Sequence, residues 1–111
     1  MTVYVVQNQR SVGPDGRLRP KFDLSPAKRF GAIVDLLNEG HSPAQVEEAL
    51  ALLQERLKDF GDDDYLLLIG NPVMIGLAVA CAAVANDGNV QMLQWSGVRR
   101  EYQPIRVRSV L

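Results

Sequence analysis

Hydrophobic positions along the chain fall into segments with two different spacings. Residues 3–7 are β-branched and aromatic, and residues 65–69 form an unbroken apolar run, so both ranges are predicted strands. The unbroken run predicts a strand buried on both faces, as in the centre of a parallel sheet. Residues 90–95 and 102–110 predict two further strands, and Pro104 indicates that the last of them lies at a sheet edge.

Three segments carry helical spacing, and each begins with a capping residue followed by proline. The first begins at Ser25 and ends before Gly40, the second runs from Ser42 to Gly61, and the third covers residues 72–85. The apolar positions of the first are Ala27, Phe30, Ile33, Val34 and Leu37. The third segment is apolar on nearly all sides, so it is predicted to be the most buried element.

The predicted order is therefore β, α, α, β, α, β, β. Residues 65–95 are predicted to form a right-handed βαβ unit. After a turn over residues 13–16, the chain is predicted to return as a short extended arm through Leu18, Lys21 and Phe22. The fold class is α/β: a single domain over residues 1–111, with a mixed sheet of about four strands and three helices in two or three layers.

Composition fits a folded domain from a reducing compartment. The chain is 47% hydrophobic, and its one cysteine excludes an internal disulfide bond. The first residues lack the basic and apolar regions of a signal peptide, so we predict a cytoplasmic location. Residues 65–85 carry no charge and could span a bilayer. The strand-to-helix junction at Gly70-Asn71-Pro72 and the acidic flanks argue against that interpretation.

Charge is unevenly distributed although the net charge is only −1. Residues 1–30 hold six basic side chains and two acids, whereas residues 31–98 hold ten acids and two bases. Residues 99–111 are again basic. Such segregation predicts two faces of opposite charge, which serve either as solvated surfaces or as docking surfaces.

The C-terminal hairpin carries the most suggestive set of side chains. Aromatic rings stack on bases, arginines contact phosphates, and the same residue types anchor protein interfaces. The predicted partner-binding residues are Trp95, Arg99, Arg100, Tyr102, Arg106 and Arg108. A secondary basic arm could join them if the first and last strands lie close together; its members are Arg10, Arg17, Arg19 and Lys21. Edge protection by charged side chains is the alternative without a partner.

The turn at Gly70 and Asn71 is a second candidate site, because a strand end there feeds a helix N-terminus that favours anions. The glycine-rich phosphate fingerprints are absent, so Asn71 is more simply a helix cap. Catalysis and metal binding have little support. His41 is the single histidine, Cys81 lies in an apolar helix, and Asp62–Asp64 read as a solvated turn. We predict no catalytic residue, no metal and no cofactor.

Several stretches resemble a family of small tailed-bacteriophage proteins whose function is not settled. They are residues 4–9, residues 20–27, residues 63–72, and residues 93–97 with the basic hairpin that follows. The resemblance covers most of the chain. It transfers no catalytic residue and implies only a setting: an accessory or host-modulating protein in an infected bacterial cell.

The predicted function is that of a non-enzymatic interaction protein, which binds a host or phage macromolecule through its basic, aromatic C-terminal hairpin. One alternative is a nucleic-acid-binding module that uses the same face. Another is a nucleotide or small-anion binder at Gly70 and Asn71. The apolar helices also leave a homodimer open.

Overall fold

A computed structural model describes residues 1–38 and 40–111. Its centre is a five-stranded sheet in the order β4-β1-β5-β6-β7. The strands are β1 (Thr2–Gln7), β4 (Ala32–Leu37), β5 (Tyr65–Leu67), β6 (Val90–Ser96) and β7 (Glu101–Val107). The first four are parallel to one another, and only β7 runs antiparallel, paired with β6. The fold is therefore α/β with a mixed sheet, and β7 forms one edge as Pro104 indicated.

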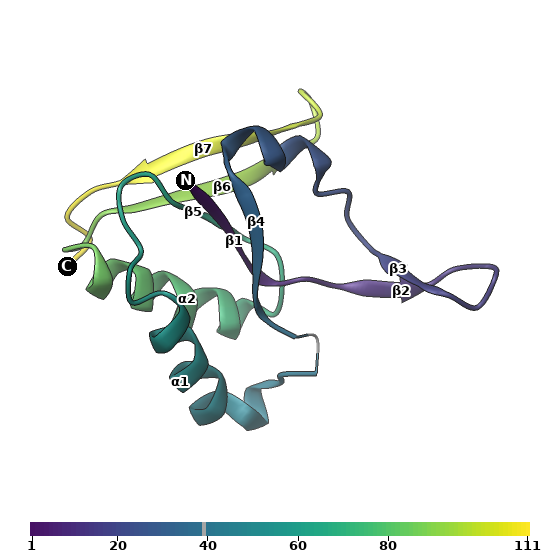
Figure 1. The fold of residues 1–111 in the computed structure, drawn as a ribbon, viewed down its shortest axis with the longest axis horizontal. Coiled ribbons are helices and arrows are strands. Elements are labelled where there is room, and N and C mark those ends of the chain that lie inside the picture. Colours follow the sequence, from purple (N-terminus) through teal and green to yellow (C-terminus); the bar gives the residue numbers. More distant parts are fainter. Residues whose placement is uncertain (39) are drawn as a thin grey trace.

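Two helices cover one face of this sheet (Figure 1): α1 (Val46–Arg56), preceded by the 3-10 turn η2 (Pro43–Gln45), and α2 (Pro72–Ala85). They enclose the larger of two hydrophobic clusters, with Leu36, Leu53 and Leu66 fully buried at its centre. The 3-10 helix η1 (Ser25–Phe30) packs on the opposite face, over a smaller cluster that includes Val5 and Leu67. The sheet is thus the middle of three layers.

A two-stranded ribbon projects from the body of the molecule (Figure 1). It consists of β2 (Arg10–Val12) and β3 (Leu18–Pro20), which pair antiparallel around a turn at residues 13–17. We call residues 10–21 the arm. The turn chemistry of Pro14, Asp15 and Gly16 predicted this feature, since Asp15 accepts from the Arg17 amide at 3.1 Å and Gly16 has φ of 77°.

Several local predictions are confirmed. The βαβ unit is β5-α2-β6, with the two strands adjacent and parallel. Helix α2 has the predicted bounds because the Asn71 side chain accepts the Val73 amide at 2.9 Å and Pro72 occupies the first turn. After the turn at residues 97–100 the predicted last strand forms as β7, although it ends at Val107 and not at Val110.

The helix predicted from Ser25 towards Gly40 is wrong. Only Ser25–Phe30 are helical, as η1, and Ala32–Leu37 form β4 instead. Gly31 separates the two with φ of 145° and ψ of 179°, a conformation that only glycine adopts readily. Leu36 and Leu37, at the end of the strand, are buried in the larger cluster, whereas Ala32, Val34 and Asp35 are exposed because β4 is an edge strand. The sheet therefore has five strands rather than about four.

The prediction that the third helix would be the most buried element is also wrong. In α2, Met74, Ala78, Ala82 and Ala83 face the sheet and are buried, but Val84 is 71% exposed. Strand β1, at the centre of the sheet, is more completely covered. A helix in an outer layer buries one face only, so uniform hydrophobicity left part of α2 facing solvent.

Among the residues that the structure describes, no helix is long and apolar enough to cross a membrane.

Candidate functional site

A cavity of about 490 Å³ opens at the carboxyl edge of the sheet, on the face that carries η1. Ligand sites in parallel sheets gather at this edge. Leu67, Ile69 and Leu93 form the apolar floor, and Phe22, Trp95 and Tyr102 form aromatic walls. The remaining lining residues are Gln9, Lys21, Asp23, Leu68, Gly70 and Gln94. We call this cavity the aromatic pocket.

Strand register places the two hairpin aromatics together. Trp95 and Tyr102 are direct partners across β6 and β7, so both side chains leave the same face of the sheet. Their ring centroids are 5.0 Å apart in an edge-to-face arrangement of 67°. Tyr102 is 3% exposed, whereas Trp95 is 47% exposed. Tyr102 is thus part of the wall, and the exposed part of the Trp95 ring is accessible to a ligand in the pocket.

The segment that follows the arm closes the pocket from the other side. The Tyr102 hydroxyl donates to the backbone oxygen of Asp23 at 3.3 Å, which ties this segment to β7. Phe22 is 40% exposed, and the Lys21 ammonium lies 5.6 Å from its ring centroid. The aromatic pocket is therefore assembled from residues about 70 positions apart, and Lys21 brings a positive charge to its rim.

Titration of Tyr102 gives a test of this packing. Burial, and secondarily the charge of Asp23, raises the pKa of Tyr102 above its ordinary value of 10.0. As pH rises, Tyr102 therefore loses its proton in the unfolded chain before it does so in the folded protein. The folded state thus loses stability as pH rises above 10.0. Burial likewise raises the pKa of Tyr4, so part of the loss remains without Tyr102. We expect urea unfolding of Tyr102→Phe to show a shallower alkaline loss than the wild type; equal slopes would contradict the buried position of the hydroxyl.

The basic residues of the C-terminal hairpin fall into two groups. Arg99 and Arg100 lie in the turn directly beyond the Trp95–Tyr102 pair, near the aromatic pocket. Arg106 and Arg108 lie at the opposite end of β7, and the Arg106 guanidinium donates to the side-chain oxygen of Gln91. The predicted six-residue cluster is thus divided between the two ends of the strand.

The arm likewise contributes only in part. Strands β1 and β7 are separated by β5 and β6, so the basic arm does not lie beside the last strand. Lys21 reaches the aromatic pocket at the base of the arm. Arg17 lies in the turn of the arm and Arg19 lies in β3, where it forms an ion pair with Asp15 at 2.7 Å. Arg10 lines a separate cavity of about 280 Å³ that also contains His41 and Arg56.

At the second candidate site, Gly70 lines the aromatic pocket, but the helix N-terminus beside it is already occupied. The Asn71 amide donates to the Gln7 side-chain oxygen at 3.0 Å, and the Val73 amide donates to the Asn71 side chain. Two of the N–H groups that an anion would use therefore already have partners within the chain. Asn71 acts as a cap.

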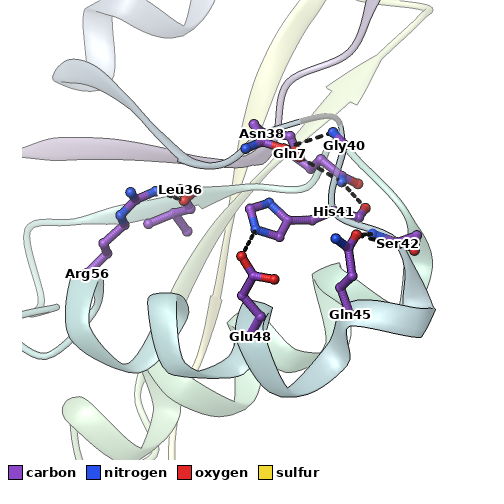
Figure 2. Close-up of polar contacts among 9 residues, drawn as sticks. All are labelled: Gln7, Leu36, Asn38, Gly40, His41, Ser42, Gln45, Glu48 and Arg56. Atoms are coloured by element: carbon purple, nitrogen blue, oxygen red, sulfur yellow. Dashed lines mark hydrogen bonds and ion pairs between the residues drawn. The ribbon is translucent and has the colours of Figure 1, made fainter.

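Gln7 connects the end of β1 to the loop after β4 and to the start of α2; Figure 2 shows its contacts with the loop. It is 3% exposed, and its amide nitrogen donates to the backbone oxygens of Asn38 at 3.0 Å and His41 at 2.7 Å. Its oxygen accepts from Asn71, as described above. From β1 the chain goes to β4 on one side, and from β5 it goes to β6 on the other side. Gln7, the last residue of β1, and Gly70, which follows β5, therefore lie at the topological switch point of the sheet.

His41 is held by the same loop (Figure 2). Its side chain is 7% exposed, and its Nε2 lies 3.7 Å from the Glu48 carboxylate on α1. On the same helix, the Arg56 guanidinium donates to the backbone oxygen of Leu36. His41 is thus a loop residue, as predicted, and it joins the loop after β4 to α1.

The other residues weighed for chemistry also have structural surroundings. The Asp64 carboxylate accepts the amides of Thr2 and Gly61, each at 3.0 Å, and Asp62 accepts from the Asn86 side chain at 2.9 Å. Burial raises the pKa of the Cys81 thiol, which disfavours the reactive thiolate. Over residues 1–38 and 40–111, no three His, Cys, Asp or Glu side chains are grouped to hold a metal ion.

Sequence reasoning missed Phe22 and Gln7. Phe22 follows a basic, turn-rich arm, and an exposed aromatic in that setting is the one local signal that it had a surface role. Gln7 ends a strand of buried residues, where a polar side chain must find partners. Neither signal identifies the residues that Gln7 and the Phe22 segment contact. Those residues, such as Asn38 and Tyr102, lie 31 or more positions away in the chain.

Comparisons with known proteins place the chain by family alone. A search of curated proteins and a search of solved structures each returned no match. A family model described as the Phage Pam3 gp32-like protein matches residues 1–109. With nearly the whole chain covered, the protein belongs to the Phage Pam3 gp32-like protein family.

Proposed function

We propose that this phage protein is a non-catalytic binding protein that recognises an acidic segment of a host or phage protein at the aromatic pocket. The observation that carries the proposal is the convergence of Phe22, Trp95 and Tyr102 on one cavity beside a basic turn. Tryptophan, tyrosine and arginine are the residue types that dominate binding energy at protein interfaces. An apolar side chain of the partner would fill the cavity.

Charge around the aromatic pocket favours an acidic partner. Lys21 lies at the rim, and Arg99 and Arg100 lie in the adjoining turn. Asp23 also lines the pocket, but its carboxylate accepts the Ser25 amide at 2.9 Å and so is engaged within the chain. Exposed cations of this kind chiefly steer association and fix orientation, while the buried anchor supplies most of the affinity.

Single-stranded nucleic acid is the second candidate, because the half-exposed ring of Trp95 beside two arginines would also suit base stacking. The two candidates differ in salt dependence. Nucleic-acid binding weakens steeply with salt because phosphate contacts release counterions, whereas an apolar anchor is much less sensitive. The occupied amides at the start of α2 give the nucleotide alternative less support.

The decisive experiment is capture of partners from bacterial lysate, with and without nuclease, using the tagged wild type and three variants. Trp95→Ala removes the exposed aromatic wall, and Arg99→Glu with Arg100→Glu reverses the charge of the turn. Arg108→Glu is the matched control at the far end of β7. We expect a protein partner that survives nuclease and is retained by the control. Loss of an anchor weakens binding by about thirtyfold, or roughly 2 kcal/mol.

Fluorescence then tests contact at the pocket itself, because Trp95 is the single tryptophan in the chain. Adding the purified partner should shift the emission of Trp95, and the shift should persist at high salt. A partner whose affinity is the same for Trp95→Ala and for the wild type would rule out this pocket. Captured material that disappears entirely after nuclease treatment would favour nucleic acid instead.

A further inference from the structure

The arm has little support from the rest of its own chain. It projects from the body (Figure 1), and Val12 and Leu18 are 68% and 61% exposed. The accessible surface is 6661 Å² for 12.3 kDa, whereas a compact monomer of this mass has roughly 6,100 Å². Two-stranded hairpins without a supporting layer are marginally stable in water. The arm is therefore a feature that a contact outside its own chain would complete.

One side of the arm is suited to an apolar surface with acidic surroundings. Val12 and Leu18 are direct cross-strand partners, so their side chains lie together on one face of the ribbon. Around them, residues 10–21 carry four basic side chains and one acid, a net charge of +3. Because the whole chain has a net charge of −1, the remainder carries −4.

The body of the molecule offers a matching surface on its helical face. A groove of about 410 Å³ lies between α1 and α2, and we call it the helix groove. Its lining residues are Leu50, Gln54, Lys58, Ala80, Cys81, Val84 and Ala85. Val84 is 71% exposed there although it lies on a helix without a charged residue. This surface lies on the face of the sheet opposite the aromatic pocket.

Acidic side chains flank the helix groove. Glu55 lies on α1, Asp87 follows the capping residue of α2, and Asp62 contacts that capping residue, Asn86. Lys58, the one cation in the lining, is paired with Glu55 at 2.9 Å. The groove thus presents an apolar centre with acidic surroundings, while the arm presents an apolar centre with basic surroundings.

We propose that the arm of one copy of this chain packs into the helix groove of a second copy. Val12 and Leu18 would cover Val84 and Leu50, and the basic side chains of the arm would face the carboxylates beside the groove. Duplex nucleic acid also attracts a basic ribbon, but it offers no apolar surface for Val12 and Leu18. The proposal does not rest on the function proposed for the aromatic pocket, although Lys21 at the base of the arm also lines that pocket.

Arm and groove are different surfaces, so this contact is heterologous, and that property allows a specific test. Leu18→Asp should disable the arm, and Val84→Lys should disable the groove, since each introduces a charge that repels the opposite surface. Both positions are exposed, so neither variant should alter the melting temperature or the circular dichroism spectrum. Val98→Asp and Val98→Lys are matched controls at a position that is 97% exposed in the hairpin turn.

Light scattering after size-exclusion chromatography, over a wide range of protein concentrations, gives the readout. We expect the wild type and both controls to reach at least twice the monomer mass of 12.3 kDa, and each disabling variant to remain at that mass. An equimolar mixture of the two disabling variants should associate again, because one retains its groove and the other its arm. Only an arm-to-groove contact predicts this recovery.

Three results would overturn the proposal. The first is a wild type that stays monomeric at every concentration, including one that changes mass only when duplex DNA is added. The second is a disabling variant that associates as strongly as the wild type. The third is a mixture of the two variants that stays monomeric, which would indicate contact between identical surfaces.

Discussion

Replacing Gln7 by leucine should cost roughly 3–5 kcal/mol of folding free energy, because buried polar groups left without partners cost about 1–3 kcal/mol each. The substitution removes the donor to the backbone oxygens of Asn38 and His41 and the acceptor for the Asn71 amide. Leucine has a similar size, so the loss reflects hydrogen bonding rather than a new cavity. Because domains of this kind are stable by about 5–15 kcal/mol, the effect is a large fraction of the total.

Urea unfolding followed by circular dichroism measures this effect. The midpoint should fall with little change in the slope, since the surface exposed on unfolding stays similar. Gln94→Leu is the matched control, because Gln94 is an exposed strand residue and surface substitutions usually change stability by about 0.5 kcal/mol or less. A Gln7→Leu variant as stable as this control would mean that the loop after β4 is not held by Gln7.

Replacing Gly70 by alanine should cost about 2–4 kcal/mol, because a strained backbone and an overpacked side chain each cost about 1–3 kcal/mol. Gly70 has φ of 134°, in the region that favours glycine. A Cβ atom there would lie 2.6 Å from the Cβ of Gln7, which is too close to the main chain to move aside. The same substitution would disturb the wall of the aromatic pocket.

Gly76→Ala is the matched control for this effect, with the opposite sign. Gly76 lies within α2, and a Cβ atom added there meets nothing within 4 Å. Alanine is a better helix former, so this variant should gain about 0.5–1 kcal/mol. Thermal and urea unfolding of the two variants, compared side by side, should move in opposite directions. A neutral Gly70→Ala would contradict the close approach of β1 and the start of α2.

The aromatic pocket and the helix groove lie on opposite faces of the sheet. The pocket uses the face with η1, and the groove uses the face with α1 and α2. Binding a partner protein at one face is therefore compatible with self-association at the other. Variants of Trp95 should leave the mass of the assembly unchanged, and variants of Val84 should leave partner capture unchanged.

Sequence alone determined the features that depend on neighbouring residues. Asn71 and Pro72 define the start of α2 through one hydrogen bond and one fixed torsion, and both act within a single turn. The turn of the arm follows in the same way from Asp15 and Gly16. The apolar run at Tyr65 indicated a strand covered on both faces, since water would otherwise meet alternate side chains.

Tertiary structure decided between helix and strand for Ala32–Leu37. Apolar residues in this segment fit a helical period and also a short strand, so local spacing does not separate the two. Pairing with β1 gives the segment backbone partners along its length, and η1 and α1 cover it. Gly31 permits the change of direction that makes this pairing possible.

The candidate site also depended on sheet order. Trp95 and Tyr102 were predicted together because a hairpin joins them, but Lys21, Phe22 and Gly70 reach them only through the order β1-β5-β6-β7. The same order separates Arg106 and Arg108 from the site. Caps, turns and hairpins are stabilised by contacts between near neighbours, and so they can be read from the sequence. A pocket is made where distant strands end side by side, and long-range packing free energy selects that arrangement.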